Sequence, residues 1–132
     1  CSAAHDPTSD HARFVQPRER GDFPVTTVDR QSIPPGGSVI LKIDVEGGEF
    51  EVVRGARATL ERAAAFAVTL EAHPAAVSRA GVDPLRIVAY LDGIRPCETR
   101  VLERPDLRLD PARPFFEQAP PTRVYNLLVT AR

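Results

Sequence analysis

One nearly continuous apolar run constrains the fold more than any other feature, the segment VILKIDV at residues 39–45. Its length suits a β-strand, and the lack of strict alternation is typical of a parallel strand covered on both faces. Burying its five apolar side chains would stabilise the fold by at most about 7–15 kcal/mol, at roughly 1.5–3 kcal/mol each. The run therefore predicts a strand inside a parallel sheet, ended by Gly47 and Gly48.

A helical period follows this strand. From residue 49 to about residue 64, Phe50, Val53 and Leu60 share one face, so we expect a single helix here. Residues 65–70 (AFAVTL) predict a second buried strand, which ends before Pro74. A strand, a helix and a strand in this order form a parallel βαβ unit, which makes the fold class α/β.

The segment before the apolar run carries weaker signals. Residues 1–22 are polar and aperiodic, and we expect a loop or the remaining part of a preceding element. Residues 23–28 (FPVTTV) are β-branched and predict an edge strand, because Pro24 cannot donate to a sheet ladder.

The second half of the chain supplies further short elements. Asp83 followed by Pro84 is a typical helix start, and Gly93 a stop, so a second helix is expected between them. We also expect short strands at residues 99–102 and 124–131, joined by a proline-rich connection at residues 105–121.

Composition restricts the class of protein. With 132 residues, 42% hydrophobic and 27% charged, the chain suits one globular domain. The net charge of −1 gives no global field that would recruit nucleic acid or anionic lipid. No apolar run approaches the roughly 20 residues that span a bilayer, and no charged-then-apolar leader opens the sequence. We therefore expect a cytoplasmic protein that binds neither nucleic acid nor membrane.

The two cysteines, Cys1 and Cys97, lie far apart and outside any metal-ligand spacing. A single disulfide is arithmetically open, but two unpaired thiols in a reducing compartment are favoured, because small secreted folds use cysteine more densely. No metal site is predicted.

Ionisable side chains follow both predicted core strands. Asp44 and Glu46 end the first strand, and Glu71 and His73 end the second. Ligands of open α/β sheets bind outside the carboxyl ends of the strands. If the two strands are neighbours, these ends lie about 5 Å apart, or about 10 Å with one strand between them. Crowded carboxylates raise one another's pKa, so we expect a centre suited to proton abstraction. The alternative for Glu46 is to meet the free N–H groups of the next helix.

Two stretches of the sequence closely resemble one family. VTTVD at residues 25–29 and VILKIDVEGGEFEVVRGA at residues 39–56 resemble the signature of FkbM-type S-adenosylmethionine-dependent methyltransferases. VTLEAH at residues 68–73 resembles the next strand of that family. The resemblance is strong over residues 23–75 and weak over the terminal strand.

The resemblance implies a class I (Rossmann-like) methyltransferase fold, a seven-stranded sheet whose last strand is antiparallel. Residues 23–132 would be its C-terminal half, with parallel strands and a terminal antiparallel pair. The glycine-rich turn and the acidic residue that hold the cofactor in such folds are not found in this sequence. We therefore expect that the isolated chain binds cofactor poorly and is inactive, and that its first core strand has an open edge favouring self-association.

The implied activity is methyl transfer from S-adenosylmethionine to a small-molecule acceptor, mostly a hydroxyl on a sugar or secondary metabolite. Asp44 is the first candidate for orienting or deprotonating that hydroxyl, supported by Glu46, Glu71 and His73. Asp29 matches the acidic residue of the family's T-x-D pattern and would lie near the acceptor, although a helix cap explains it equally well.

Two other functions remain open from the sequence. A hydrophobic strand ending in Asp-x-Glu also resembles the magnesium-holding acidic pair of phosphoryl-transfer proteins, but no phosphate-cradling loop accompanies it. The chain is otherwise compatible with a non-catalytic half-domain that serves as an interaction module.

Overall fold

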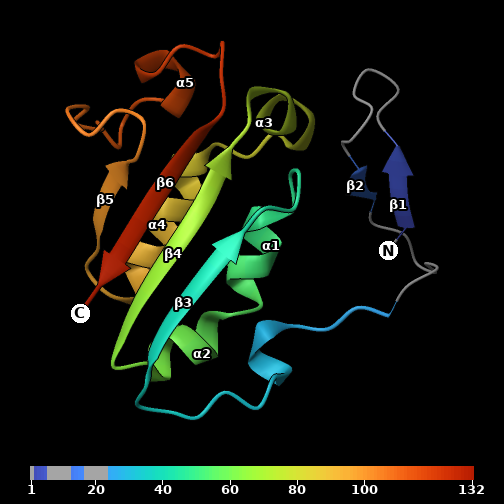
Figure 1. The fold of residues 1–132 in the computed structure, drawn as a ribbon, viewed down its shortest axis with the longest axis vertical. Helices are drawn as coiled ribbons and strands as arrows, with labels where there is room; N and C mark the ends of the chain where they lie inside the picture. The colour runs from blue at the N-terminus through green and yellow to red at the C-terminus, as the bar shows by residue number, and fades with distance from the viewer. Residues whose placement is uncertain (1, 6–12, 17–23) are drawn as a thin grey trace.

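A computed structural model describes residues 2–5, 13–16 and 24–132 of the chain. Strands β1 (Ser2–His5) and β2 (Arg13–Gln16) pair antiparallel in a sheet of their own (Figure 1), where a loop was expected. The rest of the predicted N-terminal loop, together with Cys1, lies outside the described residues.

The main sheet has four strands in the order β3-β4-β6-β5. Their bounds are Ser38–Ile43 for β3, Ala65–Ala72 for β4, Glu98–Val101 for β5 and Tyr125–Ala131 for β6. Strands β3 and β4 are parallel, and β6 lies antiparallel between β4 and β5. This arrangement confirms the predicted class, a partial Rossmann-like sheet whose last strand is antiparallel.

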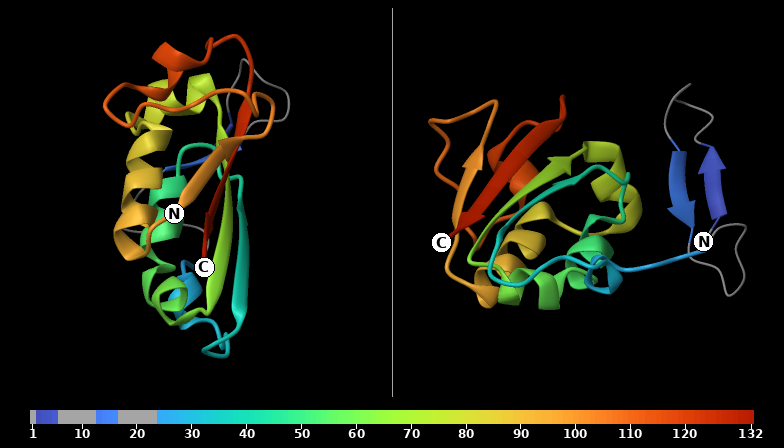
Figure 2. Two further views of the ribbon diagram at one scale, coloured as in Figure 1. Left: turned by 90° about the vertical axis from the view of Figure 1, so that its left-hand side faces the viewer. Right: turned by 60° about the horizontal axis from the view of Figure 1, so that its bottom comes forward.

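The helices of the described residues cover one face of this sheet (Figure 2). The longest of them, α4, has 11 residues, and no helix in these ranges is long and apolar enough to cross a bilayer. The helical elements are η1 (Val28–Arg30), α1 (Glu49–Arg54), α2 (Arg57–Arg62), α3 (Pro74–Ala80), α4 (Pro84–Ile94) and α5 (Phe115–Gln118).

Because the helices lie on one side, strand β3 is covered on one face, and the prediction that both faces are covered is wrong for the described residues. Val39 and Ile43 point into the core and are buried, whereas Ile40 is 79% exposed. Strands β4 and β6 alternate in the same way between buried and half-buried positions. The core fills the space between sheet and helices, and its fully buried side chains include Val53, Leu60, Val68, Leu70, Leu91, Val101, Phe115, Leu127 and Val129.

The single helix expected over residues 49–64 is two helices, α1 and α2, interrupted at Gly55. A Cβ atom at Gly55 would stand 3.2 Å from the side chain of Thr27, so the segment before β3 packs closely on the break. The Asp29 N–H also donates to the Gly55 carbonyl at 2.8 Å. The edge strand predicted at residues 23–28 is therefore wrong for its described part: residues 24–27 are irregular and lead into η1.

Asp29 caps helix α2. Its carboxylate accepts hydrogen bonds from the N–H groups of Ala58, at 3.1 Å, and Thr59, at 2.8 Å. Burial acts to raise the pKa of Asp29, but these hydrogen bonds outweigh it, and the pKa lies below the ordinary value of 3.8. Both oxygens serve the helix, so we assign Asp29 to helix capping rather than to acceptor binding.

Replacing this cap should destabilise the chain in a pH-dependent way. We expect Asp29→Ala to lower the free energy of unfolding by about 0.5–2 kcal/mol at neutral pH, as for other helix caps. A carboxyl whose pKa is lowered by folding stabilises the fold above its unfolded pKa, and the stabilisation disappears as the pH falls through the folded pKa. Urea unfolding should thus show a difference between the two proteins that is constant above pH 5 and shrinks below about pH 4; a pH-independent difference would contradict the role of the charge.

Strand β3 has an open edge, and self-association of the chain through this edge stays a prediction. Within the described residues β3 pairs with β4 alone, and Ile40 is exposed beside that edge. Ile40→Lys should shift sedimentation profiles toward monomer, because a lysine on an edge strand opposes pairing. Val25→Lys, at a position 65% exposed outside the sheet, is the matched control. A wild-type chain that is monodisperse and melts cooperatively at high concentration would argue against the prediction.

Candidate functional site

Acidic side chains from two neighbouring strands meet at one edge of the sheet. Strands β3 and β4 run parallel with Ile43 opposite Leu70, so Asp44 and Glu71 follow at the same end. Carboxylate oxygens of Asp44, Glu46 and Glu71 lie within 4.8 Å of one another. The two strands that carry these residues, β3 and β4, lie side by side and point the same way (Figure 1). We call these three side chains the acidic cluster.

Two cations border the acidic cluster. The Lys42 ammonium lies 3.0 Å from an Asp44 carboxylate oxygen, and the Arg79 guanidinium lies 3.8 Å from a Glu46 oxygen. Arg79 comes from α3, a helix that the periodicity did not reveal. Its start and stop were nevertheless visible, because Pro74 is a typical first helical residue and Gly81, in the left-handed region at φ 67°, a typical C-terminal one.

The turn after β3 holds Glu46 in an uncommon conformation. Glu46 has φ 52°, in the left-handed region that non-glycine residues seldom occupy, and Gly47 follows at φ 109°. The buried Glu49 side chain closes the turn by accepting a hydrogen bond from the Gly47 N–H at 3.0 Å. Helix α1 begins after Gly48 without a side-chain cap, so Glu46 does not take the capping alternative.

The surroundings of Glu71 change its affinity for a proton. Burial raises its pKa above the ordinary value of 4.5, and the negative charges of Asp44 and Glu46 raise it further. His73, when it carries a positive charge, and Lys42 oppose this shift without cancelling it. A carboxylate with a raised pKa is a stronger base than an ordinary one, which suits it to accept a proton.

His73 takes part in a helix cap. Its Nδ1 atom accepts a hydrogen bond from the Ala75 N–H at 3.1 Å, at the start of α3. A neutral imidazole that accepts at Nδ1 carries its proton on Nε2, which leaves no ring nitrogen free to accept another. We therefore assign His73 to positioning α3 rather than to proton abstraction.

Further polar residues lie at the same edge of the sheet, and the sequence alone did not indicate them. Asn126 of β6 lies opposite Glu71 and donates from its backbone and side-chain nitrogens to the Glu103 carboxylate, at 2.8 Å each. Burial acts to raise the pKa of Glu103, but the hydrogen bonds from Asn126 outweigh it and the pKa is lowered. No local motif links two residues 23 positions apart: the pairing of β5 with β6 brings Glu103 to Asn126, and the pairing of β6 with β4 brings Asn126 to this edge.

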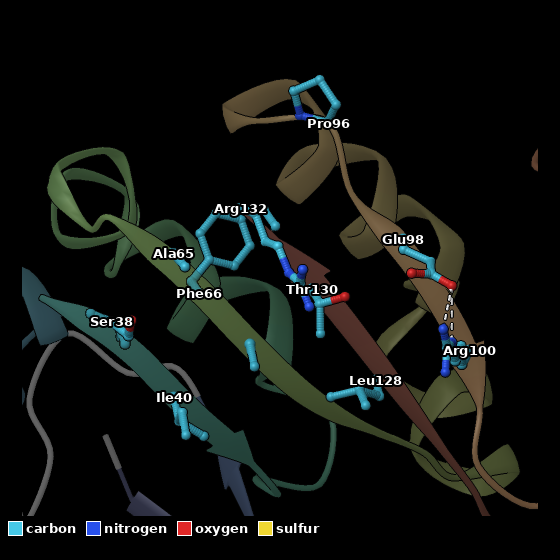
Figure 3. Close-up of a pocket in the computed structure, with 13 residues that line it drawn as sticks. Ser38, Ile40, Ala65, Phe66, Pro96, Glu98, Arg100, Leu128, Thr130 and Arg132 are labelled. Atoms are coloured by element: carbon cyan, nitrogen blue, oxygen red, sulfur yellow. Dashed lines mark hydrogen bonds and ion pairs between the residues drawn. The ribbon is translucent and has the colours of Figure 1, made fainter.

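A hollow lies away from the acidic cluster. It measures about 780 Å³ and lies on the uncovered face toward the start of β3 and β4 (Figure 3). Ile40, Leu128 and Thr130 line it, and the paired side chains of Glu98 and Arg100 stand at its rim. Beside Glu71, by contrast, a crevice of about 10 Å³ has room for one water at most.

The acidic cluster is the one group of three or more metal-type ligands in the described part of the chain. Two of its carboxylates already pair with Lys42 and Arg79, and we assign no metal to it. Cys97 is a free thiol whose Sγ donates to the Arg95 carbonyl at 3.0 Å. Burial, aided by Asp92, raises the pKa of Cys97 to about 11, so it stays protonated and unreactive at neutral pH.

A partial Rossmann-like sheet places acidic residues at its carboxyl edge, where open α/β sheets bind their ligands. Residues 2–101 match the family described as the methyltransferase FkbM domain. The chain therefore belongs to the FkbM methyltransferase family, and the resemblance seen in its sequence is confirmed. No significant match was found among curated proteins or among solved structures.

The charges of the acidic cluster make a prediction for Glu71. We expect Asp44→Asn and Glu46→Gln each to lower the pKa of Glu71, because each removes a negative charge that raises it. Carbon-13 NMR titration of glutamate-labelled chain measures this, with Glu71→Gln assigning the signal. Glu98→Gln, at the far end of the sheet, is the control and should leave the Glu71 titration unchanged; an unchanged titration in both cluster variants would contradict the coupling.

Proposed function

We propose that this chain is part of an S-adenosylmethionine-dependent O-methyltransferase whose acceptor is a hydroxyl of a sugar or another small metabolite. The described residues would supply the acceptor side of the reaction. Membership of the FkbM methyltransferase family supports methyl transfer. The observation that carries the assignment is the acidic cluster at the carboxyl edge, with one carboxyl of raised pKa.

A hydroxyl acceptor suits this cluster because methylation of oxygen requires the loss of a proton. Glu71 would accept that proton, since burial and neighbouring charges raise its pKa and so its basicity. Asp44, 47% exposed and paired with Lys42, would accept a hydrogen bond from the acceptor and orient its oxygen. Asp44, the first candidate from the sequence, thus stays a site residue, but the proposed general base is Glu71.

The described residues do not fit the cofactor by themselves. The glycine pair that follows β3 is closed by the Glu49 carboxylate, where an anionic part of a ligand would otherwise meet the Gly47 N–H. The crevice beside Glu71 is too small for a nucleoside. We therefore derive no step through the cofactor and propose that residues beyond these 132 hold it.

Methyl transfer tests the proposal directly. The natural polypeptide that carries these residues would be incubated with S-adenosylmethionine labelled in its methyl group and a panel of sugars, phenols and amines. We expect label on oxygen, with Glu71→Gln slowing transfer by about 10²–10⁴-fold, the usual contribution of a general base. Glu98→Gln is the matched control and should retain full activity.

Other outcomes would contradict parts of the proposal. Label on nitrogen alone would exclude a hydroxyl acceptor, and no transfer to any compound would favour the interaction-module alternative. Calorimetric titration of the 132-residue chain with S-adenosylmethionine tests the cofactor argument separately. Binding at micromolar concentration by this chain would overturn the inference that the cofactor is held elsewhere.

A further inference from the structure

Helix α3 contacts the ends of both strands that carry the acidic cluster. It begins at Pro74, directly after β4, with His73 as its cap. Its other end lies against the turn after β3: a Cβ atom on Gly47 would stand 3.3 Å from the Ala80 Cβ and 3.7 Å from the Ala76 carbonyl. The helix thus connects the strand that carries Glu71 to the turn that carries Glu46.

Arg79 makes a second, electrostatic contact between this helix and the turn. Its guanidinium lies 3.8 Å from a Glu46 carboxylate oxygen, and the two side chains are 33% and 23% exposed. Partial burial strengthens such a pair relative to one in open solvent. Glu46 is also the residue at φ 52°, so its backbone adopts a conformation that needs support from its surroundings.

We propose that Arg79 is a positioning residue: its guanidinium holds the Glu46 carboxylate beside Glu71, so that Glu71 is the member of the acidic cluster that accepts the hydroxyl proton. The part concerning proton acceptance rests on the proposed function. The part concerning geometry does not, because it can be measured in the absence of any methyl acceptor.

The charges around Glu71 allow a positioning role of Arg79 to be distinguished from a direct electrostatic effect of Arg79 on Glu71. Lys42 acts on Glu71 directly and lowers its pKa, whereas Arg79 lies against Glu46. Glu46 is the link, because its negative charge raises the pKa of Glu71. The groups around Glu71 include Asp44 and Glu46 from the turn after β3, Lys42 from β3, His73 from the end of β4, Arg79 from α3 through its contact with Glu46, and Asn126 from β6, which Glu103 holds.

This difference fixes opposite signs for two substitutions. Arg79→Gln should lower the pKa of Glu71, because Glu46 is released and its charge moves away. Lys42→Gln should raise the pKa of Glu71, because a nearby positive charge is lost. If Arg79 were only a nearby cation, its removal would also raise the pKa of Glu71. The carbon-13 titration of glutamate-labelled chain distinguishes the two directions.

A double-mutant cycle makes the test specific to Glu46. Arg79→Gln should add no further change to the Glu71 titration once Glu46→Gln is present, since the residue it positions is gone. Arg79→Lys should restore most of the wild-type titration by keeping the charge. Arg86→Gln, which removes an α4 arginine stacked over Phe50, is the control and should have no effect.

Each possible result tests a different part of the proposal. A raised or unchanged pKa of Glu71 in Arg79→Gln, with a native circular dichroism spectrum, would overturn the positioning role. Additive effects of Arg79→Gln and Glu46→Gln would also overturn it. Methyl transfer that survives Glu71→Gln would refute the proposed base while leaving the titration result intact, so the two failures can be told apart.

Discussion

The parallel pairing of β3 with β4 is the constraint on which the site depends. Ile43 lies opposite Leu70 in this register, and no strand intervenes, so neighbouring strand ends stand about 5 Å apart. Acidic residues 27 positions apart in sequence, Asp44 and Glu71, therefore share one edge. A shift of the register by one residue would turn the buried side chains of β3 away from the core, which ties the site geometry to the hydrophobic effect.

The fold meets the resulting repulsion in three ways. Asp44 is left 47% exposed and paired with Lys42, so much of its charge is screened by water and an ammonium group. Glu46 is placed on a turn and paired with Arg79. At Glu71, burial and the negative charges of Asp44 and Glu46 raise the pKa, so the repulsion appears there as an increased affinity for protons. The differences between the three environments give chemically similar side chains different properties.

Much of the architecture could be predicted from local patterns. The run at residues 39–45 and the alternation from Ala65 are strong signals, and the capping pair Asp83-Pro84 marks the start of α4. The predictions from sequence were wrong where long-range packing determines the local structure. The β-branched residues before η1 favour a strand, yet Asp29 draws this segment onto the N-terminus of α2. Gly55 interrupts a helical period because Thr27 packs against it, a contact that periodicity cannot reveal.

The site was predictable in its acidic members and not in their partners. Asp44, Glu46 and Glu71 follow strands, and the rule for α/β sheets selects them. Arg79, Asn126 and Glu103 reach the same edge through the packing of α3 and the placement of β6, for which the sequence holds no local signal. The functional ranking also needed coordinates, since the cap made by His73 and the burial of Glu71 are properties of the folded chain.

The position of β6 has a consequence for how the chain reaches this state. Phe66 of β4 pairs with Ala131 of β6. One of the two strands beside β4 is therefore formed by the last residues described. A ribosome would release β3, β4 and the helices between them well before that neighbour emerges. Contacts of such long sequence separation slow folding and leave apolar edges open to other chains meanwhile. The main sheet therefore cannot be completed until β6 has been synthesised, well after β3 and β4.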